Sequence, residues 1–443
     1  MVKNYIIFIL FTCVFSQNML TVNNGYGSGN YNTGDTIHVW SNLNPLNNSF
    51  GGWDGNIEFL INPNEWHTKL IMPNTDIIIS AQNISMPEIN FENELIMGAQ
   101  NFKDVYYIFP ENPKATIIMF HGGSGNASDF ANRVEGFQFY NDMLNAQYSI
   151  IITESEDRTL NDQNQDGVTQ WQLLPLDLTN IDIINIQTLI DTFTIRGNIN
   201  AEYPVFAVGV SNGGNFASVV SYALDFDVSV MFSSQGNPPE LYEVTNIPTI
   251  FCPAKYDPAL GGGNVGALMN YEVLLNRNIP VEYFELDKSP LYSQRFSRIE
   301  QIDDEMSNQL MLEFQNNNLI DENNFFTILD DVFIQYFQEN PQNYPIFQSL
   351  PIYLKKHVTD QLKVVTADHS FFSNFNHKIN DIFINYLILF GDMNNDGHIN
   401  VVDIVSLVNL ILDSDYQING DLNQDGLLNV IDIVQLVNEI LTQ

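Results

Sequence analysis

Short apolar runs alternate with helical segments along the chain from about residue 98 to about residue 288. This alternation is typical of a parallel sheet with crossover helices, because strands covered on both faces need no polar side. Apolar residues at helical spacing predict helices over 181–193 and 215–223. The predicted strands cover residues 116–120, 149–153, 205–208, 228–232, 249–252 and 281–286. The expected fold class is therefore α/β.

The pattern changes after the last of these strands. Residues 289–360 lose the strand signal and become helical and polar, which predicts a helical cap inserted into the α/β domain. A short strand over 362–366 and a last helix over 379–389 are expected to close this domain, which then spans 98–390.

Residues 18–90 are rich in Gly, Asn and Trp and carry short alternating runs separated by turn signals, such as Asn23-Asn24-Gly25 and Gly51-Gly52. This pattern predicts a small all-β module. Its segments Tyr31-Asn32-Thr33-Gly34-Asp35 and Phe50-Gly51-Gly52-Trp53-Asp54-Gly55 resemble a repeat of bacterial surface proteins. The resemblance implies a spacer or adhesion role and no chemistry.

The N-terminal residues indicate where the protein acts. A basic start at Met1–Lys3, an apolar run at Tyr5–Phe15 and the segment Val14-Phe15-Ser16 predict a secretory signal peptide over 1–16. That run is too short to span a bilayer, and no other run reaches about 18 apolar residues, so no membrane span is expected. We expect a secreted protein, extracellular or attached to the cell surface.

Asp and Glu number 53 and Lys and Arg number 16, for a formal net charge of −37. Such a surface repels phosphate backbones and anionic lipid heads, so no nucleic-acid partner is expected. It favours cations.

A serine motif follows the predicted strand at 205–208. Gly209-Val210-Ser211-Asn212-Gly213 has the form G-x-S-x-G and precedes a helical run. The pattern alone is weak, but between a strand and a helix it predicts a nucleophile elbow, a strained turn that exposes the serine hydroxyl. A Gly-rich loop without chemistry is the alternative.

Acyl transfer also needs N–H donors for the oxyanion. His121-Gly122-Gly123 directly follows the strand 116–120, so Gly122 and Gly123 are candidate donors, and Asn212 supplies another. We expect the His121 side chain to brace this loop and not to act as the base.

The acid and the base should follow the serine in the chain. Asp257 comes after the strand 249–252, where an orienting carboxylate belongs. Of the later histidines, His369 precedes the final helix and is favoured as the base over His357, in a Lys-rich helical context, and over His377, at a solvated helix start.

With these parts in order, residues 98–390 resemble the α/β-hydrolase family, more narrowly its secreted esterase and depolymerase-like members. The resemblance implies Ser211 as nucleophile, His369 as general base and then acid, and Asp257 as its orienter. About eighty residues separate 286 from His369, which departs from simple members and is attributed to the cap. The expected activity is hydrolysis of carboxylic esters, in acylated polysaccharide or a polyester, without a catalytic cofactor. A peptidase or amidase on the same fold and a non-catalytic surface-adhesion component are the alternatives.

The segment Asp162-Gln163-Asn164-Gln165-Asp166-Gly167 alternates oxygen side chains before a glycine, as calcium loops do. Its twelfth position is Leu173, so an Asx-rich surface turn is favoured. Trp171, just beyond, is either a pocket wall or part of the core.

Residues 391–443 contain two copies of one pattern, 29 residues apart. Each copy has oxygen side chains at EF-hand loop spacing, a glycine at position 6 and then an apolar helix, expected at 404–412 and 433–441. At position 7 His398 and Leu427 would each offer a backbone carbonyl. The side-chain ligands would be Asp392, Asn394, Asp396, Asn400 and Asp403 in the first loop and Asp421, Asn423, Asp425, Asn429 and Asp432 in the second.

The doubled loop and helix resembles a type I dockerin. The resemblance implies an all-α domain that folds on two structural Ca²⁺ ions and binds a cohesin-type module on a scaffold or cell surface. The residues at loop positions 10 and 11 are Val401-Val402 and Val430-Ile431, where family members often carry hydroxyls, so the choice of cohesin stays open.

Overall fold

The computed structural model describes residues 17–163, 165–258, 264–328, 332–394, 398–413, 415–423 and 425–442. The predicted signal peptide at residues 1–16 lies outside these residues. The chain divides into two compact units. The first holds the residues up to Ile89 with Lys288–Thr366 and Ser373–His377, and the second holds Asn90–Asp287, Ala367–Phe372 and Lys378–Gln443.

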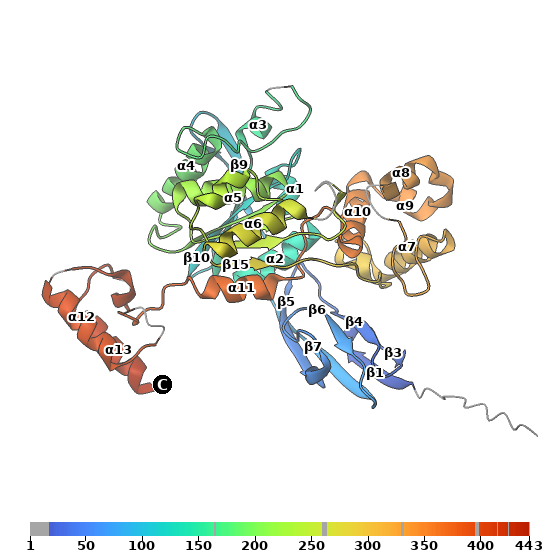
Figure 1. Ribbon diagram of the computed structural model, residues 1–443, viewed down its shortest axis with the longest axis horizontal. Helices are drawn as coiled ribbons and strands as arrows, with labels where there is room; N and C mark the ends of the chain where they lie inside the picture. Colours follow the sequence, from blue (N-terminus) through green and yellow to red (C-terminus); the bar gives the residue numbers. More distant parts are fainter. Residues whose placement is uncertain are drawn as a thin grey trace, which may run out of the picture. The chain divides into compact units, whose positions relative to one another are not determined.

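Two small sheets form the N-terminal part of the first unit, with strand orders β3-β1-β7-β5 and β2-β4-β6 (Figure 1). Exposure alternates along β1 and along the first half of β4, so one side of these strands faces a shared core. Leu20, Ile37, Trp53 and Ile79 meet in that core. The strands are β1 (Asn18–Asn23), β2 (Gly25–Tyr26), β3 (Gly29–Tyr31), β4 (Thr36–Ser41), β5 (Asn48–Gly55), β6 (His67–Ile71) and β7 (Ile77–Ser85), with a 3-10 turn η1 (Ile57–Phe59).

The other part of the first unit is helical, as the sequence predicts for 289–360. Phe314 lies at its centre, with ring centroids 5.9 Å from Phe326 and 5.4 Å from Phe337. The elements are η4 (Arg295–Arg298), α7 (Asp304–Asn316), α8 (Val332–Glu339), η5 (Pro341–Asn343), α9 (Pro345–Ser349) and α10 (Ile352–Thr366).

The strand predicted at 362–366 is wrong, because these residues form the last turn of α10. Val364 and Val365 favour a strand by local preference. Leu354, Val358 and Leu362 are buried at helical spacing on the same element, and this packing outweighs the local preference.

An eight-stranded sheet forms the centre of the second unit, in the order β15-β14-β13-β12-β10-β11-β9-β8 (Figure 1). Strand β9 pairs antiparallel with both β8 and β11, and all other neighbouring strands of this sheet are parallel. This mixed sheet fits the α/β-hydrolase fold. The strands are β8 (Glu92–Met97), β9 (Phe102–Ile108), β10 (Ala115–Phe120), β11 (Tyr148–Thr153), β12 (Val205–Val210), β13 (Val228–Phe232), β14 (Thr249–Cys252) and β15 (Val281–Tyr283).

All six predicted strands are present in this sheet, although β15 ends earlier than expected. Strands β8 and β9 were not predicted, because both are partly exposed and lack a continuous apolar run.

Helices cover both faces of this sheet, because neighbouring residues of each strand point to opposite sides. On β12, Ala207 packs in the cluster with Phe216 of α5, whereas Phe206 stacks on Phe383 of α11 at 4.0 Å. The helices are α1 (Ala127–Ala131), α2 (Val134–Asn145), α3 (Glu156–Thr159), α4 (Ile181–Ile195), α5 (Asn212–Leu224), η2 (Pro239–Glu243), α6 (Val265–Asn276) and α11 (Asn376–Ile384).

The C-terminal segment contains α12 (Val401–Asp413), η6 (Ile418–Gly420) and α13 (Val430–Thr442). Met393, Leu407 and Leu436 form its buried centre. Both long helices begin three residues before the predicted starts, so Asp403 and Asp432 lie in their first turns.

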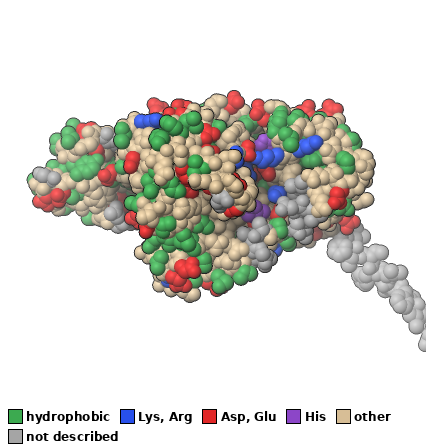
Figure 2. Space-filling view, turned by 90° about the horizontal axis from the view of Figure 1, so that it is seen from above, with side chains coloured by type: hydrophobic (Ala, Val, Ile, Leu, Met, Phe, Trp, Pro, Cys, Tyr) green, Lys and Arg blue, Asp and Glu red, His purple; other side chains and the backbone are tan. Residues whose placement is uncertain are grey.

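The acidic composition of the chain is visible on its surface. Acidic side chains are spread over the face drawn in Figure 2, and basic ones are sparse. None of the helices in the described part of the chain combines the length and the apolar character that a bilayer-crossing segment requires.

Phe216→Ala tests the packing between α5 and the sheet. Phe216 is fully buried, stacks on Trp171 at 4.6 Å and meets Phe120 edge-on at 5.2 Å. We expect the free energy of unfolding to fall by about 3–5 kcal/mol in urea titrations, because the cavity left beside the two remaining rings cannot fully collapse. Tyr222→Ala on the same helix, where the side chain is 37% exposed, should change it by less than about 1 kcal/mol. Equal losses in the two variants would contradict this account.

Candidate active site

Ser211 lies on the turn between β12 and α5 with backbone angles of φ 58° and ψ −125°. Few non-glycine residues adopt such a conformation, and it projects the side chain from the end of the strand. A Cβ on Gly209 would meet the Gly213 carbonyl oxygen at 2.1 Å, and a Cβ on Gly213 would meet the His121 carbonyl oxygen at 2.3 Å. The two glycines of the motif are therefore required by the turn itself.

The loop after β10 lies against this turn. A Cβ on Gly122 would be 3.3 Å from the Cβ of Ser211, so the Gly122 backbone directly neighbours the serine. Asn212 is the first residue of α5, where a backbone N–H has no acceptor within the helix. Gly123 is exposed in the same loop. Gly122 and Asn212 are thus both direct neighbours of Ser211.

Asp257 and His369 form a hydrogen-bonded pair. The His369 Nδ1 atom lies 2.7 Å from Asp257 Oδ2, and the Asp257 side chain is fully buried while that of His369 is 24% exposed. With Nδ1 donating to the carboxylate, Nε2 is the nitrogen left to accept a proton. His357 lies on α10 in the first unit, and His377 in the first turn of α11.

The segment that carries His369 is tied to two strand ends. The Tyr256 N–H donates to the Ala367 carbonyl, and the Ser233 hydroxyl donates to the Ser370 carbonyl. Ser233 directly follows β13, and Tyr256 belongs to the loop after β14. These bonds fix the histidine from both sides although α10, and not a strand, precedes it.

His121 braces the loop, as expected. Its Nδ1–H donates to the Gly122 carbonyl at 2.8 Å, and its Nε2 accepts from the Ser155 N–H at 3.3 Å. Burial lowers the pKa of His121 to about 4, which keeps the ring neutral. Trp171 donates from Nε1 to the His121 carbonyl and is 2% exposed, so it belongs to the core.

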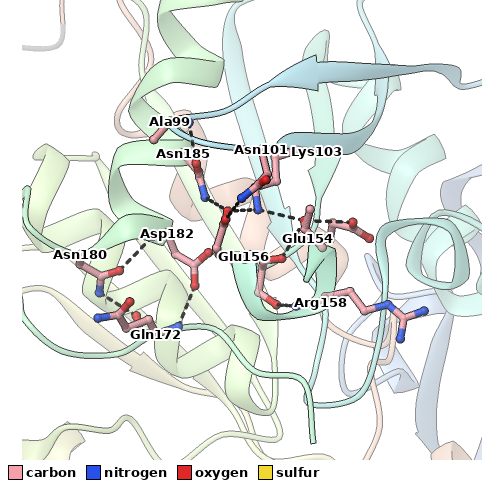
Figure 3. Close-up of polar contacts among 12 residues, drawn as sticks. Ala99, Asn101, Lys103, Glu154, Glu156, Arg158, Gln172, Asn180, Asp182 and Asn185 are labelled. Carbon is pink, nitrogen blue, oxygen red and sulfur yellow. Dashed lines mark hydrogen bonds and ion pairs between the residues drawn. The ribbon is translucent and has the colours of Figure 1, made fainter. Parts of the chain in front are cut away.

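A buried polar network joins residues around β9, α3 and α4 (Figure 3). Next to Gln172 in the chain, the Trp171 N–H donates to the Asn212 side chain at the start of α5. Glu156 pairs with Lys103 of β9 and accepts from Asn101 and Asn185. Asp182 accepts from the backbone N–H groups of Glu156 at 2.6 Å and Gln172 at 2.8 Å. Burial raises the pKa of Asp182 to about 6.

The sequence analysis did not find this network. Its members come from β9, α3 and α4, and no local pattern links these segments. The one available signal was a lysine inside an otherwise partly apolar strand, Phe102–Ile108.

The Asp162 segment forms the turn favoured above, because Asp162 accepts from the backbone N–H groups of Asp166 and Gly167 at 3.2 and 2.9 Å. Asn164 lies outside the described residues.

The C-terminal loops use their aspartates and asparagines to bind backbone N–H groups. Asp403 accepts from Met393 and Asn400, and Asp421 accepts from Asp425 and Gly426. Asn400 accepts from the Val402 N–H, and Asn423 accepts from the Asp425 N–H. Asn429 accepts from the Ile431 N–H, and Asp432 accepts from the Asn429 N–H. The other predicted loop residues that the structure describes are Asn394, His398 and Leu427.

Such hard oxygen donors suit Ca²⁺. Asp396 lies outside the described residues, and among the described ones no group of three or more His, Cys, Asp or Glu side chains is placed to hold a metal.

His121→Asn tests the neutral buried imidazole. The folded-state pKa of about 4 lies below the ordinary 6.5, so the unfolded chain binds more protons between these values and wild-type stability falls on acidification. Asp182 has the opposite effect, but it is present in both proteins and cancels. We expect the difference in unfolding free energy between wild type and variant to shrink by about 2 kcal/mol from about pH 7 to about pH 5. A difference that is constant in urea titrations at both pH values would contradict a neutral His121.

Comparison with known proteins gives only distant structural similarity. No family model matches the chain, and no curated protein matches it. A puromycin-hydrolyzing peptidase of Mycobacterium tuberculosis is 10% identical over 46% of this chain, with a TM-score of 0.34, and the match spans 38% of its own length. The esterase Est22 with p-nitrophenol is 12% identical over 44% of this chain and 71% of its own (TM-score 0.33). A dienelactone hydrolase of Anabaena variabilis is 12% identical over 52% of this chain and 99% of its own (TM-score 0.34).

Proposed function

We propose that the protein is a serine hydrolase that cleaves carboxylic esters, with Ser211 as nucleophile, His369 as general base and Asp257 as its orienter. The observation that carries the proposal is the 2.7 Å pair of His369 and buried Asp257 in the same unit as the strained turn of Ser211. Ser211, Asp257 and Gly122 all follow the carboxyl ends of parallel strands, the edge at which α/β sheets bind their ligands.

The roles follow from the chemistry of these groups. His369 Nε2 would take the proton from Ser211 Oγ as Oγ attacks the ester carbonyl, and the N–H groups of Asn212 and of Gly122 or Gly123 would stabilise the oxyanion. The alcohol would leave with that proton, giving an acyl-enzyme. A water, deprotonated by the same nitrogen, would then release the acid and restore Ser211. Asp257 holds the imidazole in the Nδ1–H tautomer throughout.

The substrate class proposed is an acyl ester on polysaccharide or in a polyester, acted on outside the cell. The predicted export segment and the low share of charged residues, 16%, support this location. Peptide and amide substrates are the competing class, because the same groups cleave both bonds. A comparison of ester and anilide substrates separates the two.

We also propose that the C-terminal segment binds one Ca²⁺ per loop and attaches the enzyme to a cohesin-type module. The spacing of the oxygen side chains supports this, as do Asp403 and Asp432, fully buried in the first turns of α12 and α13. Loop residues at positions 1, 3, 5, 9 and 12 would hold the ion, with the carbonyls of His398 and Leu427 at position 7.

Single substitutions in the full-length protein test the catalytic roles with p-nitrophenyl acetate. Ser211→Ala should lower kcat on the order of 10⁶-fold. Asp257→Asn should lower it about 10⁴-fold, because the wrong imidazole tautomer is favoured. His369→Ala should be as inactive as the serine variant, with an unchanged melting temperature in each case.

The matched controls are His357→Ala and His377→Ala, which should keep wild-type kcat. A fully active, folded Ser211→Ala protein would overturn the mechanism. If a control variant loses activity while the His369→Ala protein stays active, another histidine is the general base.

Calcium titration of the chelator-treated protein by calorimetry tests the second proposal. We expect two bound ions per chain in wild type and one in Asp432→Ala, because that variant loses the closing carboxylate of one loop. Asp413→Ala removes an exposed acid of α12 at no ligand position and should still bind two. No heat of binding at millimolar Ca²⁺ would overturn the proposal.

A further inference from the structure

A cleft of about 790 Å³ opens within the first unit. Strand β4 and the turn before β3 form one wall, and residues 290–292 and 322–325 of the helical part form the other. Its volume lies within the range of small-molecule sites, roughly 300–1,000 Å³. All of its lining belongs to one compact unit, so the cleft is a property of that unit alone.

A row of aromatic rings runs along the cleft, and His38, Trp40, Tyr292 and Phe325 of this row belong to its lining. Tyr292 lies 4.8 Å from Trp40 by ring centroids, Trp40 stacks on His38 at 5.8 Å, and His38 meets Phe325 edge-on at 6.1 Å. On the far side Tyr26 stacks on Tyr292 at 4.7 Å. The row contains rings from the strands and from the helical part, so it joins the two walls of the cleft.

Polar side chains with unused hydrogen-bonding capacity stand beside these rings. Within the described part of the chain, the side chains of Glu322, Asn323 and Asn324 make no hydrogen bond, although all three line the cleft. Their loop is held in place, because Asp321 Oδ1 accepts from the N–H groups of Asn323 and Phe325 at 2.9 and 2.8 Å. The backbone of this loop is therefore fixed, and its three exposed polar side chains are accessible to a ligand.

The charge of the lining selects among ligand classes. Asp35 and Glu322 are acidic, and no Lys or Arg belongs to the lining as the structure describes it. His67, behind His38, has its pKa lowered by burial and by the nearby cations Lys69, Arg295 and Arg298, which lie outside the lining. The acidic side chains of the lining itself disfavour phosphorylated, sulfated or carboxylated ligands.

We propose that this cleft binds a neutral oligosaccharide. The apolar C–H faces of sugar rings fit aromatic ring faces, which carry the negative side of the ring quadrupole. Sugar hydroxyls can donate to Glu322 and Asp35 and exchange hydrogen bonds with the amides of Asn323 and Asn324. A lining of aromatic rings and amides therefore suits a sugar, which alternates apolar faces and hydroxyls, better than it suits an aliphatic ligand. The site is distinct from Ser211 and does not depend on hydrolysis there.

Calorimetry on the full-length Ser211→Ala protein tests the proposal, because that background excludes turnover of the probe. The probes are neutral hexasaccharides of β-linked glucose, xylose and mannose, with hexagalacturonate as the anionic control and tetramethylammonium as the cationic one. We expect at least one neutral hexasaccharide to bind and hexagalacturonate not to bind. Adding Phe325→Ala should weaken the neutral probe about tenfold, and Asn323→Ala should weaken it as well.

Phe102→Ala is the matched control, since its ring is 58% exposed on β9 in the second unit, and it should leave binding unchanged. Absence of binding by every neutral hexasaccharide overturns the proposal, as does equal binding in wild type and Phe325→Ala. Binding of tetramethylammonium alone, lost in Glu322→Gln, would identify a cation site instead. Because none of these measurements uses catalysis, a failure here and a failure of the hydrolase mechanism are separate results.

Discussion

The turn at Ser211 depends on a steric constraint, the absence of a side chain at Gly209 and Gly213. Those two positions let the end of β12, the start of α5 and the loop after β10 approach within distances that a Cβ would forbid. The same approach sets Gly122 beside Ser211. The same close backbone contact therefore places both the proposed nucleophile and its proposed oxyanion donors.

Polar groups buried around the turn keep this arrangement rigid. Trp171 donates its backbone N–H to the Asn212 side chain and its ring N–H to the His121 carbonyl. The segment that carries Trp171 is fixed in turn by Asp182 and Glu156, whose charges are compensated by Lys103 and by backbone donors. Such a network is stabilising only when every member has a partner, so its parts are expected to act as a unit.

Much of the second unit was predictable because its signals are local. Buried parallel strands appear as apolar runs, and Ser211 and Asp257 could be selected by their places after predicted strands. His369 was selected by its place before the final helix, and the strand predicted at 362–366 just before it is in fact the end of α10. Strands β8 and β9 lack such runs, and Val364 and Val365 favour a strand locally although tertiary packing makes them helical. The Lys103–Glu156 pair and the aromatic row at Tyr292 and Trp40 join segments far apart in sequence, which no local pattern records.

The aromatic row also bears on the order in which the chain folds. Trp40 and Tyr26 are synthesised early, yet their partner Tyr292 follows all eight strands of the large sheet in the sequence. Trp66 likewise waits for Arg298 and for Ser373, whose carbonyl accepts its ring N–H. The N-terminal rings therefore lack these later contacts until the central sheet has been synthesised, although Trp40 already has His38 and His67 beside it. Because contacts of long sequence separation form slowly, we expect the closure of the first unit to be a slow step.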